Sequence, residues 1–182
     1  MVESETSLVL PNKQAIINIM KLKGVPPQVI AHEIAVSRKA VKIAYAVVHV
    51  EVNVNLVKIG ALVHDIGRSV SHKFDHGLIG AEIIRELEFS EPLARIAECH
   101  LLAGLNSEEA KNFGLPEKDF RPQTIEEKIV CLADKYISGT QKVTIEDRFQ
   151  SWELRWGESE FLTSQKKRAQ DLEIEILHLM YD

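Results

Sequence analysis

Five polar residues occupy positions of predicted helices where apolar side chains are expected. They belong to five separate helical patterns: His32, His64, His76, His100 and Asp134. Residues three or four positions away on the same face are apolar, as Val29 and Val36 are for His32. A polar side chain in such a place must be hydrogen-bonded or bound to a metal ion. An internal hydrogen bond would explain any one of them, but five together favour a shared site.

These residues, with Asp65 directly after His64, form a ligand set of nitrogen and oxygen atoms. Such a set suits divalent iron, manganese, zinc, nickel or magnesium rather than copper(I). Divalent ions neutralise charge on phosphoryl oxygens and lower the pKa of a bound water. The residues therefore predict a site for a divalent metal ion. The sequence has no G-x-S-x-G motif and no glycine-rich phosphate loop, which argues against acyl transfer and P-loop chemistry.

Helices must position these residues, because apolar residues recur at spacings of three and four along most of the chain. The pattern predicts an all-α protein of six to eight helices. Glycine, proline and polar residues separate the helices, and residues 104–122 form an irregular segment that we expect to be a rim or lid. The expected helices span residues 12–23, 28–50, 55–64, 76–89, 91–102, 107–113, 124–138 and 158–181.

Composition indicates one globular domain over residues 1–182, with 45% hydrophobic and 27% charged residues. The net charge of -5 and the lack of a dense basic tract argue against stable nucleic-acid binding. Cys99 and Cys131 fall within apolar patterns and are expected to be buried, reduced thiols. The first residues lack the features of a signal peptide, and no apolar run approaches the ~20 residues of a membrane span. We expect a cytoplasmic protein without membrane association.

The sequence HDIG at residues 64–67, with His32 upstream and Asp134 downstream, resembles the H…HD…D signature of the HD phosphohydrolase superfamily. It is similar to the HDIG-containing branch in particular. HGLIGAEII from His76, and His100 in IAECHLL, resemble the additional histidines of members with two metal ions. The similarity spans about residues 28–138, which leaves residues 148–182 as a C-terminal helical extension.

This resemblance implies an HD-domain helical bundle with the metal site in the core between helices. The first ion would be bound by His32, His64, Asp65 and Asp134. Asp65 would also bridge to a second ion bound by His76 and His100. Many two-metal members carry a His-His pair where this chain has His100-Leu101, so one or two ions are expected.

Further roles are expected around this ligand set. Arg68, directly after HDIG, matches a position where similar proteins carry a basic residue, and its guanidinium can bind phosphate through two hydrogen bonds. We therefore expect Asp65 and Arg68 to be catalytic. His72 and Lys73 in the same loop are candidates for substrate contact, and Glu82 could orient a ligand histidine. The alternative for Arg68, His72, Lys73 and Glu82 is that each is a surface side chain exposed to water, with no role at the site.

The leading hypothesis is a metal-dependent phosphohydrolase that cleaves a phosphomonoester or phosphodiester in a small, nucleotide-like substrate. One alternative keeps the metal site but uses two irons for oxidative cleavage. Another is a non-catalytic sensor or interaction module with the same fold. Trp152 and Trp156 are one helical turn apart and either pack on the core or line a homodimer surface.

Overall fold

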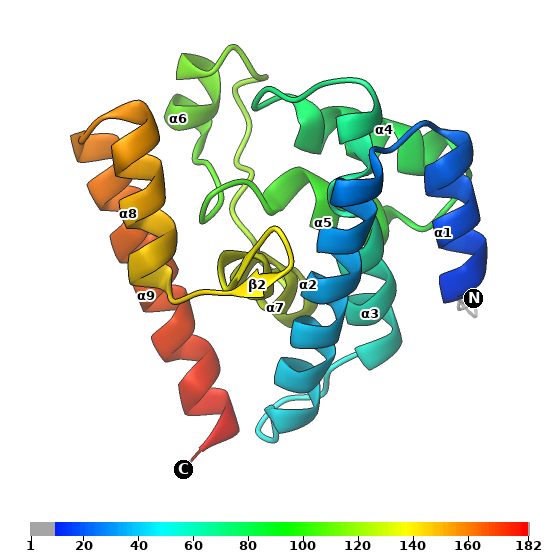
Figure 1. Cartoon of the computed structure of the whole chain (residues 1–182). Helices are drawn as coiled ribbons and strands as arrows, with labels where there is room; N and C mark the ends of the chain where they lie inside the picture. Colours follow the sequence, from blue (N-terminus) through cyan, green and yellow to red (C-terminus); the bar gives the residue numbers. More distant parts are fainter. Residues whose placement is uncertain (1–9, 182) are drawn as a thin grey trace, which may run out of the picture.

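A computed structural model describes residues 10–181 of the chain (Figure 1). Within these residues the secondary structure is almost entirely helical, which confirms the predicted all-α class. The elements are α1 (Lys13–Leu22), α2 (Pro27–Ala46), α3 (Val54–Val63), the 3-10 helix η1 (Ile66–Ser69), α4 (His76–Glu86), α5 (Glu91–Cys99), α6 (Ser107–Asn112), α7 (Ile125–Lys135), β1 (Ile137–Ser138), β2 (Gln141–Lys142), α8 (Ile145–Trp156) and α9 (Glu160–Met180).

Side-chain caps determine where several helices begin. The side chain of Asn12 accepts a hydrogen bond from the backbone of Ala15 at the start of α1, and Asn53 does the same for Leu56 in α3. Thr124 caps α7 through the backbone N–H of Glu127. These side chains satisfy backbone donors that have no partner within the helix. The predicted helix starts at Asn12 and Thr124 are confirmed.

Helix α3 is central to the core, because most of its residues are buried and only Asn55 and Lys58 are exposed. It packs against α2, α5 and α7, which are the helices that carry or precede the predicted ligands. Gly60 permits the contact with α5, since a Cβ atom there would lie 2.4 Å from Cδ1 of Ile96. This close approach brings the C-terminal ends of α3 and α5 together, and with them His64 and His100.

Several expected helices end earlier in the structure, including those expected over residues 76–89 and 91–102, which end at Glu86 and Cys99. The helix expected over residues 28–50 ends at Ala46, because Val47 is extended and the backbone N–H of Val48 donates to Leu179 in the C-terminal helix. The helix expected over residues 124–138 ends at Lys135 and is followed by a two-stranded antiparallel hairpin, β1–β2. Gly139, with φ of 57°, allows the tight turn between these strands.

Helices α8 and α9 pack against each other on one flank of the molecule (Figure 1). Aromatic rings join this flank to the irregular segment 104–122. The ring centroids of Phe74 and Phe113 lie 4.3 Å apart, and those of Phe113 and Phe161 lie 5.1 Å apart. Segment 104–122 therefore packs between the loop before α4 and helix α9. Among residues 10–181, no helix combines the length and apolar character that crossing a membrane would require.

Candidate metal centre

The six predicted ligands come from five different helices or their ends. His64 directly follows α3, and His100 directly follows α5. His76 is the first residue of α4, and Asp134 lies in the last turn of α7. His32 is in the second turn of α2, and Asp65 is the residue before η1. The structure brings all six together in the core, as the sequence predicted.

One group of ligand atoms surrounds the carboxylates of Asp65 and Asp134. Nε2 of His32 lies 2.9 Å from Oδ1 of Asp134. Nε2 of His64 lies 3.8 Å from the same oxygen and 3.9 Å from Oδ2 of Asp65. The imidazole of His64 is completely buried, whereas 13% of the His32 side chain is exposed. This group therefore has one wall open toward solvent, on the side of His32.

A second group shares Asp65 through its other oxygen. Nε2 of His76 lies 3.0 Å from Oδ1 of Asp65, and Nε2 of His100 lies 3.2 Å from it. The two Nε2 atoms are themselves 3.2 Å apart. All three side chains are buried. Oδ1 and Oδ2 of Asp65 therefore face different sets of histidines.

The spacings in the second group, and that between His32 and Asp134, fit the edges of a metal coordination sphere, whereas those around His64 are wider. Ligands about 2.1 Å from a divalent ion and at right angles to each other are about 3 Å apart. Nε2 of His64 and Oδ1 of Asp65 are buried, and neither has a hydrogen-bond partner among the described residues. Buried polar atoms without a partner are costly. A cation between the side chains would satisfy them, so the donor set fits a metal ion.

The outer nitrogen of each histidine is oriented by a backbone carbonyl. Nδ1 of His64 lies 2.9 Å from the carbonyl oxygen of Ala61, and Nδ1 of His100 lies 2.7 Å from that of Ala97. His32 and His76 are oriented in the same way by the carbonyl oxygens of Gly139 and Lys73. If each Nδ1 carries the proton, Nε2 presents its lone pair to the centre, as metal ligation requires.

Burial and neighbouring charges set the protonation of the ligands. Burial lowers the pKa of His64 to about 3 and also lowers the pKa of His100. Burial would raise the pKa of Asp65, but the neighbouring imidazoles, His64 foremost, hold it well below its ordinary value. These side chains are therefore neutral histidines and an ionised carboxylate near pH 7, the forms in which they bind metals.

His32 and Asp134, the partly exposed members of the first group, interact with charged neighbours. Burial opposes a charge on His32, but the hydrogen bond with Asp134 and the negative charges of Asp134 and Asp65 together outweigh this effect and raise the pKa of His32. Burial would likewise raise the pKa of Asp134, and the Lys135 ammonium beside it holds that pKa well below its ordinary value. His32 is thus the ligand most readily protonated in the absence of a metal ion.

Lys135 is a buried cation that sequence reasoning did not assign to the site. Its Nζ donates to Oδ2 of Asp134 over 2.6 Å and to the carbonyl oxygen of His100 over 2.9 Å. Only 1% of Lys135 is exposed. Because Oδ2 of Asp134 is occupied in this way, Oδ1 is the oxygen left facing the histidines. The adjacency of Asp134 and Lys135 at a helix end was the only signal in the sequence.

Glu33 and Arg148 also contact the ligand set without having been predicted. Oε1 of Glu33 accepts a hydrogen bond from the backbone N–H of Asp65 over 3.2 Å. Burial and repulsion from Asp65 raise the pKa of Glu33 well above its ordinary value, which favours the neutral acid. Arg148 reaches from α8 to donate to the carbonyl oxygens of Asp134 and Ile137. Nothing in the local sequence around Arg148 indicates this contact.

The other predicted residues lie at different distances from the centre. Nε of Arg68 donates to Oδ2 of Asp65 over 2.8 Å, and 28% of the Arg68 side chain is exposed. His72 and Lys73 are exposed in the loop that leads to α4. Glu82 is exposed on α4, and backbone carbonyls already occupy the positions that would orient the histidines. The structure brings Arg68 to the site and does not bring Glu82 there.

Comparison with known sequences gives a family and two informative relatives. Residues 29–139 match the family described as HD domain. Over 133 residues the chain is 50% identical to the uncharacterized protein MJ0778 of Methanocaldococcus jannaschii, covering 72% of this chain and 79% of that protein. It is 35% identical over 144 residues to the tRNA (cytidine(56)-2'-O)-methyltransferase of Picrophilus torridus. That match covers 79% of this chain but only 41% of the methyltransferase.

Solved structures show the same fold. The chain superposes on the HD domain of the L. monocytogenes phosphodiesterase PgpH with a TM-score of 0.53 and 20% sequence identity. The superposition covers 94% of this chain and 100% of the PgpH domain. The complex of that domain with cyclic-di-AMP gives a TM-score of 0.52. The likeness extends beyond the segment that matches the family and includes most of the C-terminal helices.

Proposed function

The chain belongs to the HD domain family, and on this premise we propose that it is a metal-dependent phosphohydrolase of the HDIG-containing branch. The observation that carries the proposal is the position of Asp65 between two groups of histidines, with one oxygen facing each group. Metal ions bound there would supply Lewis acidity toward phosphoryl oxygens and a water of lowered pKa. The residues around them are arranged for phosphoester cleavage.

We further propose two ions for each chain. The first would be bound by a group containing both carboxylates: His32, His64, Asp65 and Asp134. The second would be bound by Asp65, His76 and His100, whose ligand atoms lie within 3.2 Å of one another. Leu101, in the position of the second histidine of many two-metal relatives, offers no ligand atom, so the second ion would need non-protein ligands to complete its coordination. A nitrogen-rich set favours iron, manganese, nickel or zinc over magnesium.

Arg68 is the best-placed residue for binding the phosphoryl group. Its Nε is used by Asp65, but its Nη groups donate to no acceptor among residues 10–181. The guanidinium is partly exposed, so a ligand can reach it. Two free N–H groups beside the carboxylate that faces both metal positions can engage phosphate oxygens. Arg68 would therefore neutralise phosphoryl charge next to the ions.

Three acidic and basic groups hold the ligand set in place during turnover. Lys135 fixes the orientation of Asp134, and the backbone hydrogen bond to Glu33 fixes the start of η1 at Asp65. Arg148 ties the end of α7 to α8. None of these groups needs to transfer a proton for hydrolysis, since the attacking water would be supplied at the metal ions.

The proposed substrate is a small nucleotide with a phosphomonoester or phosphodiester bond. Support comes from the HD domain of PgpH, which shares the fold and has been solved with cyclic-di-AMP. His72 and Lys73 are exposed beside the site and would contact parts of the substrate away from the cleaved bond. The methyltransferase name is not transferred, because the match covers 41% of that protein and its name describes the whole.

We propose that residues 1–182 act as one HD domain, with a core over residues 28–138 and a helical extension over residues 148–182. The extension contributes Arg148, which contacts the metal-binding end of α7. It also contributes Phe161 to the aromatic contacts around segment 104–122. The extension therefore belongs to the same structural unit as the proposed active site.

Activity measurements on metal-loaded protein test this function. The chain, purified after chelator treatment, would be loaded separately with Fe(II), Mn(II), Ni(II), Zn(II) and Mg(II) and assayed with a panel of nucleotide monoesters and diesters. We expect phosphate release or cleavage of a diester with at least one ion. No activity is expected in the presence of the chelator. Oxygen uptake without hydrolysis would instead support the di-iron oxygenase alternative. Metal binding without either activity would support a non-catalytic module.

A further inference from the structure

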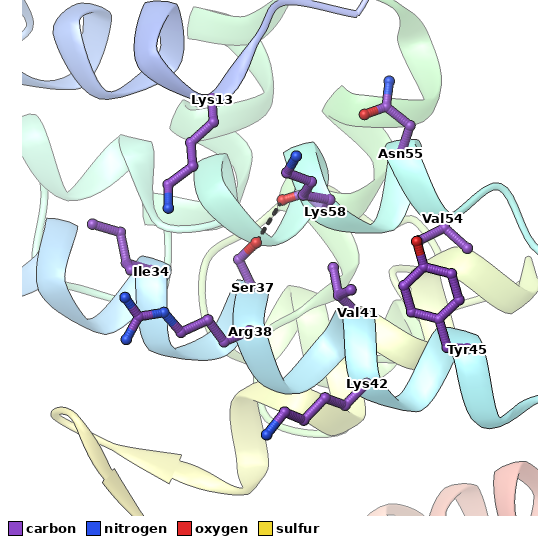
Figure 2. A pocket seen from close by; sticks show the side chains of 10 residues that line it. All are labelled: Lys13, Ile34, Ser37, Arg38, Val41, Lys42, Tyr45, Val54, Asn55 and Lys58. Carbon is purple, nitrogen blue, oxygen red and sulfur yellow. Dashed lines mark hydrogen bonds between the residues drawn. The ribbon is translucent and has the colours of Figure 1, made fainter.

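Figure 2 shows a basic groove beside α2, on the side of the helix that includes Ser37 and Val41. It has a volume of about 620 Å³ and is bounded by α1, α2 and α3. Val41 lies in its wall, nine positions beyond His32, which at 3.6 residues per turn is about two and a half turns along the helix. The groove and the metal centre therefore use opposite faces of the same helix and share no residue.

Every charged side chain that lines the groove is a cation. Lys13 reaches in from α1, Lys58 comes from α3, and Arg38 and Lys42 project from α2 (Figure 2). None of these four forms an ion pair with a carboxylate among residues 10–181. By contrast, Lys166 and Lys167 are each paired with a carboxylate. Four cations that form no ion pair in the described part of the chain therefore line the same groove.

The surroundings of these cations strengthen their effect on an anion. Ile34, Val41 and Val54 form apolar parts of the wall, which are poorer at screening charge than water. The Ser37 hydroxyl donates to the backbone carbonyl of Lys58, so it joins α2 to α3 and is not a free polar group. A single exposed lysine binds anions weakly, but four cations from three helices that line one groove raise the positive potential there together.

Tyr45 and Asn55 add features that an inorganic anion would not need. Tyr45 lies on the same face of α2 as Arg38 and Lys42 at the edge of the groove, with 73% of the residue exposed. An exposed aromatic ring next to cations is suited to stacking on a nucleobase. The exposed amide of Asn55 can both donate and accept hydrogen bonds.

We propose that this groove binds a nucleoside triphosphate, with its phosphates among Lys13, Arg38, Lys42 and Lys58 and its base against Tyr45. The volume is within the range of roughly 300 to 1,000 Å³ that is usual for small-molecule sites. The ligand is held without the metal centre, so this site does not depend on the proposed phosphohydrolase activity.

Titration calorimetry on the full chain in chelator tests the proposal, because binding at the metal centre is then removed. The probes are inorganic triphosphate, ATP and inorganic monophosphate. The double variant Arg38→Gln/Lys42→Gln removes two exposed charges from the groove. The control Lys111→Gln/Lys167→Gln removes two exposed charges elsewhere. We expect triphosphate to bind at least tenfold more tightly than monophosphate, and the groove variant to weaken triphosphate binding at least tenfold. The control should stay within twofold.

The variant Tyr45→Ala distinguishes binding of the base from binding of the phosphates. It should weaken ATP binding several-fold and leave triphosphate binding unchanged. The proposal is overturned if the wild-type chain binds no triphosphate at millimolar concentration, or if the control variant loses as much affinity as the groove variant. Equal binding of ATP and triphosphate, unaffected by Tyr45→Ala, would rule out a nucleotide site. Each of these outcomes is independent of whether the metal-loaded protein hydrolyses phosphoesters.

Discussion

Lys135 donates a hydrogen bond from Nζ to Oδ2 of Asp134, the residue before it, over 2.6 Å. The same ammonium group donates to the carbonyl oxygen of His100, so one buried cation contacts a member of each proposed metal site. Its positive charge offsets the carboxylate without occupying Oδ1, the oxygen that faces His32. Lys135 therefore acts as a positioning residue for the metal centre.

Replacing Lys135 with methionine should weaken metal binding by roughly 10- to 100-fold, the range seen when partners of metal ligands are lost. Methionine retains much of the side-chain volume but leaves Oδ2 of Asp134 buried without its donor. Competition with a chelator of known affinity would measure the change. Lys142→Met, at an exposed position on β2, is the control and should bind metal as the wild type does. Unchanged affinity in Lys135→Met would show that the lysine does not position Asp134.

Metal stoichiometry should respond differently to three alanine variants. Asp65→Ala should lose both ions, because each oxygen of Asp65 faces one group of histidines. His100→Ala should lose the second ion and keep the first. His178→Ala changes an exposed residue on α9 and should bind as many ions as the wild type. Elemental analysis of each purified variant measures this, and full metal content in Asp65→Ala would refute the ligand assignment.

Gly67 should tolerate no larger residue, because it packs directly against the backbone of α4. A Cβ atom at Gly67 would lie 2.0 Å from the carbonyl oxygen of His76 and 2.6 Å from the backbone nitrogen of Gly80. Gly67→Ala should therefore destabilise the protein by about 3 kcal/mol and disturb His76. At Gly80 the nearest atom would be 3.2 Å away, so Gly80→Ala should cost about 1 kcal/mol.

Urea unfolding and metal analysis of both glycine variants would check this order. We expect Gly67→Ala to be the less stable of the two variants and to lose metal more readily. If Gly80→Ala were the more damaging change, the packing of η1 on α4 would differ from that described above.

The metal-free protein should lose stability as pH falls from about 6.5 toward 3, because His64 remains neutral in the folded state. Burial lowers its pKa from 6.5 to about 3. In the unfolded chain the imidazole takes up a proton below about pH 6.5. The unfolded state therefore binds more protons in this window, and acidification favours unfolding. Between pH 6.5 and 5 the contribution is roughly 2 kcal/mol.

His32 opposes this trend, since its pKa is raised in the folded state. Its contribution is fully present below the unfolded pKa and is lost as pH rises through the folded value. The midpoint of unfolding in urea, measured with chelator present at pH 7 and pH 5, would show which of the two histidines has the larger effect on stability. The decrease on acidification should be smaller in His64→Gln than in the wild type and unchanged in His178→Gln. An equal decrease in His64→Gln would contradict the role assigned to His64.

Helical periodicity is a local property, and it was enough to predict which residues would lie together in the core. His64 and His76 could be placed on inward faces from their own neighbours, and each reaches the centre as expected. The partners of the ligands could not be placed in this way. Arg148 contacts Asp134 only because α8 packs beside the end of α7, and that arrangement depends on contacts between helices distant in sequence.

The ends of helices could not be predicted from the local sequence for the same reason. Val47 and Val48 continue the apolar pattern of α2, yet the helix ends at Ala46 because Val48 bonds to the backbone of Leu179. The expected role of Glu82 failed for a related reason. Backbone carbonyls, including that of Lys73 for His76, orient the histidines, and main-chain acceptors leave no signal in side-chain sequence.

The central claim is that this chain binds two metal ions that share Asp65. Crystals of the metal-loaded protein, with diffraction recorded on both sides of the absorption edge of the bound metal, would test it most directly. The account predicts two anomalous peaks on either side of the Asp65 carboxylate, one beside His64 and Asp134 and the other beside His76 and His100. A protein saturated with metal that shows only one peak beside Asp65, or none, would contradict it.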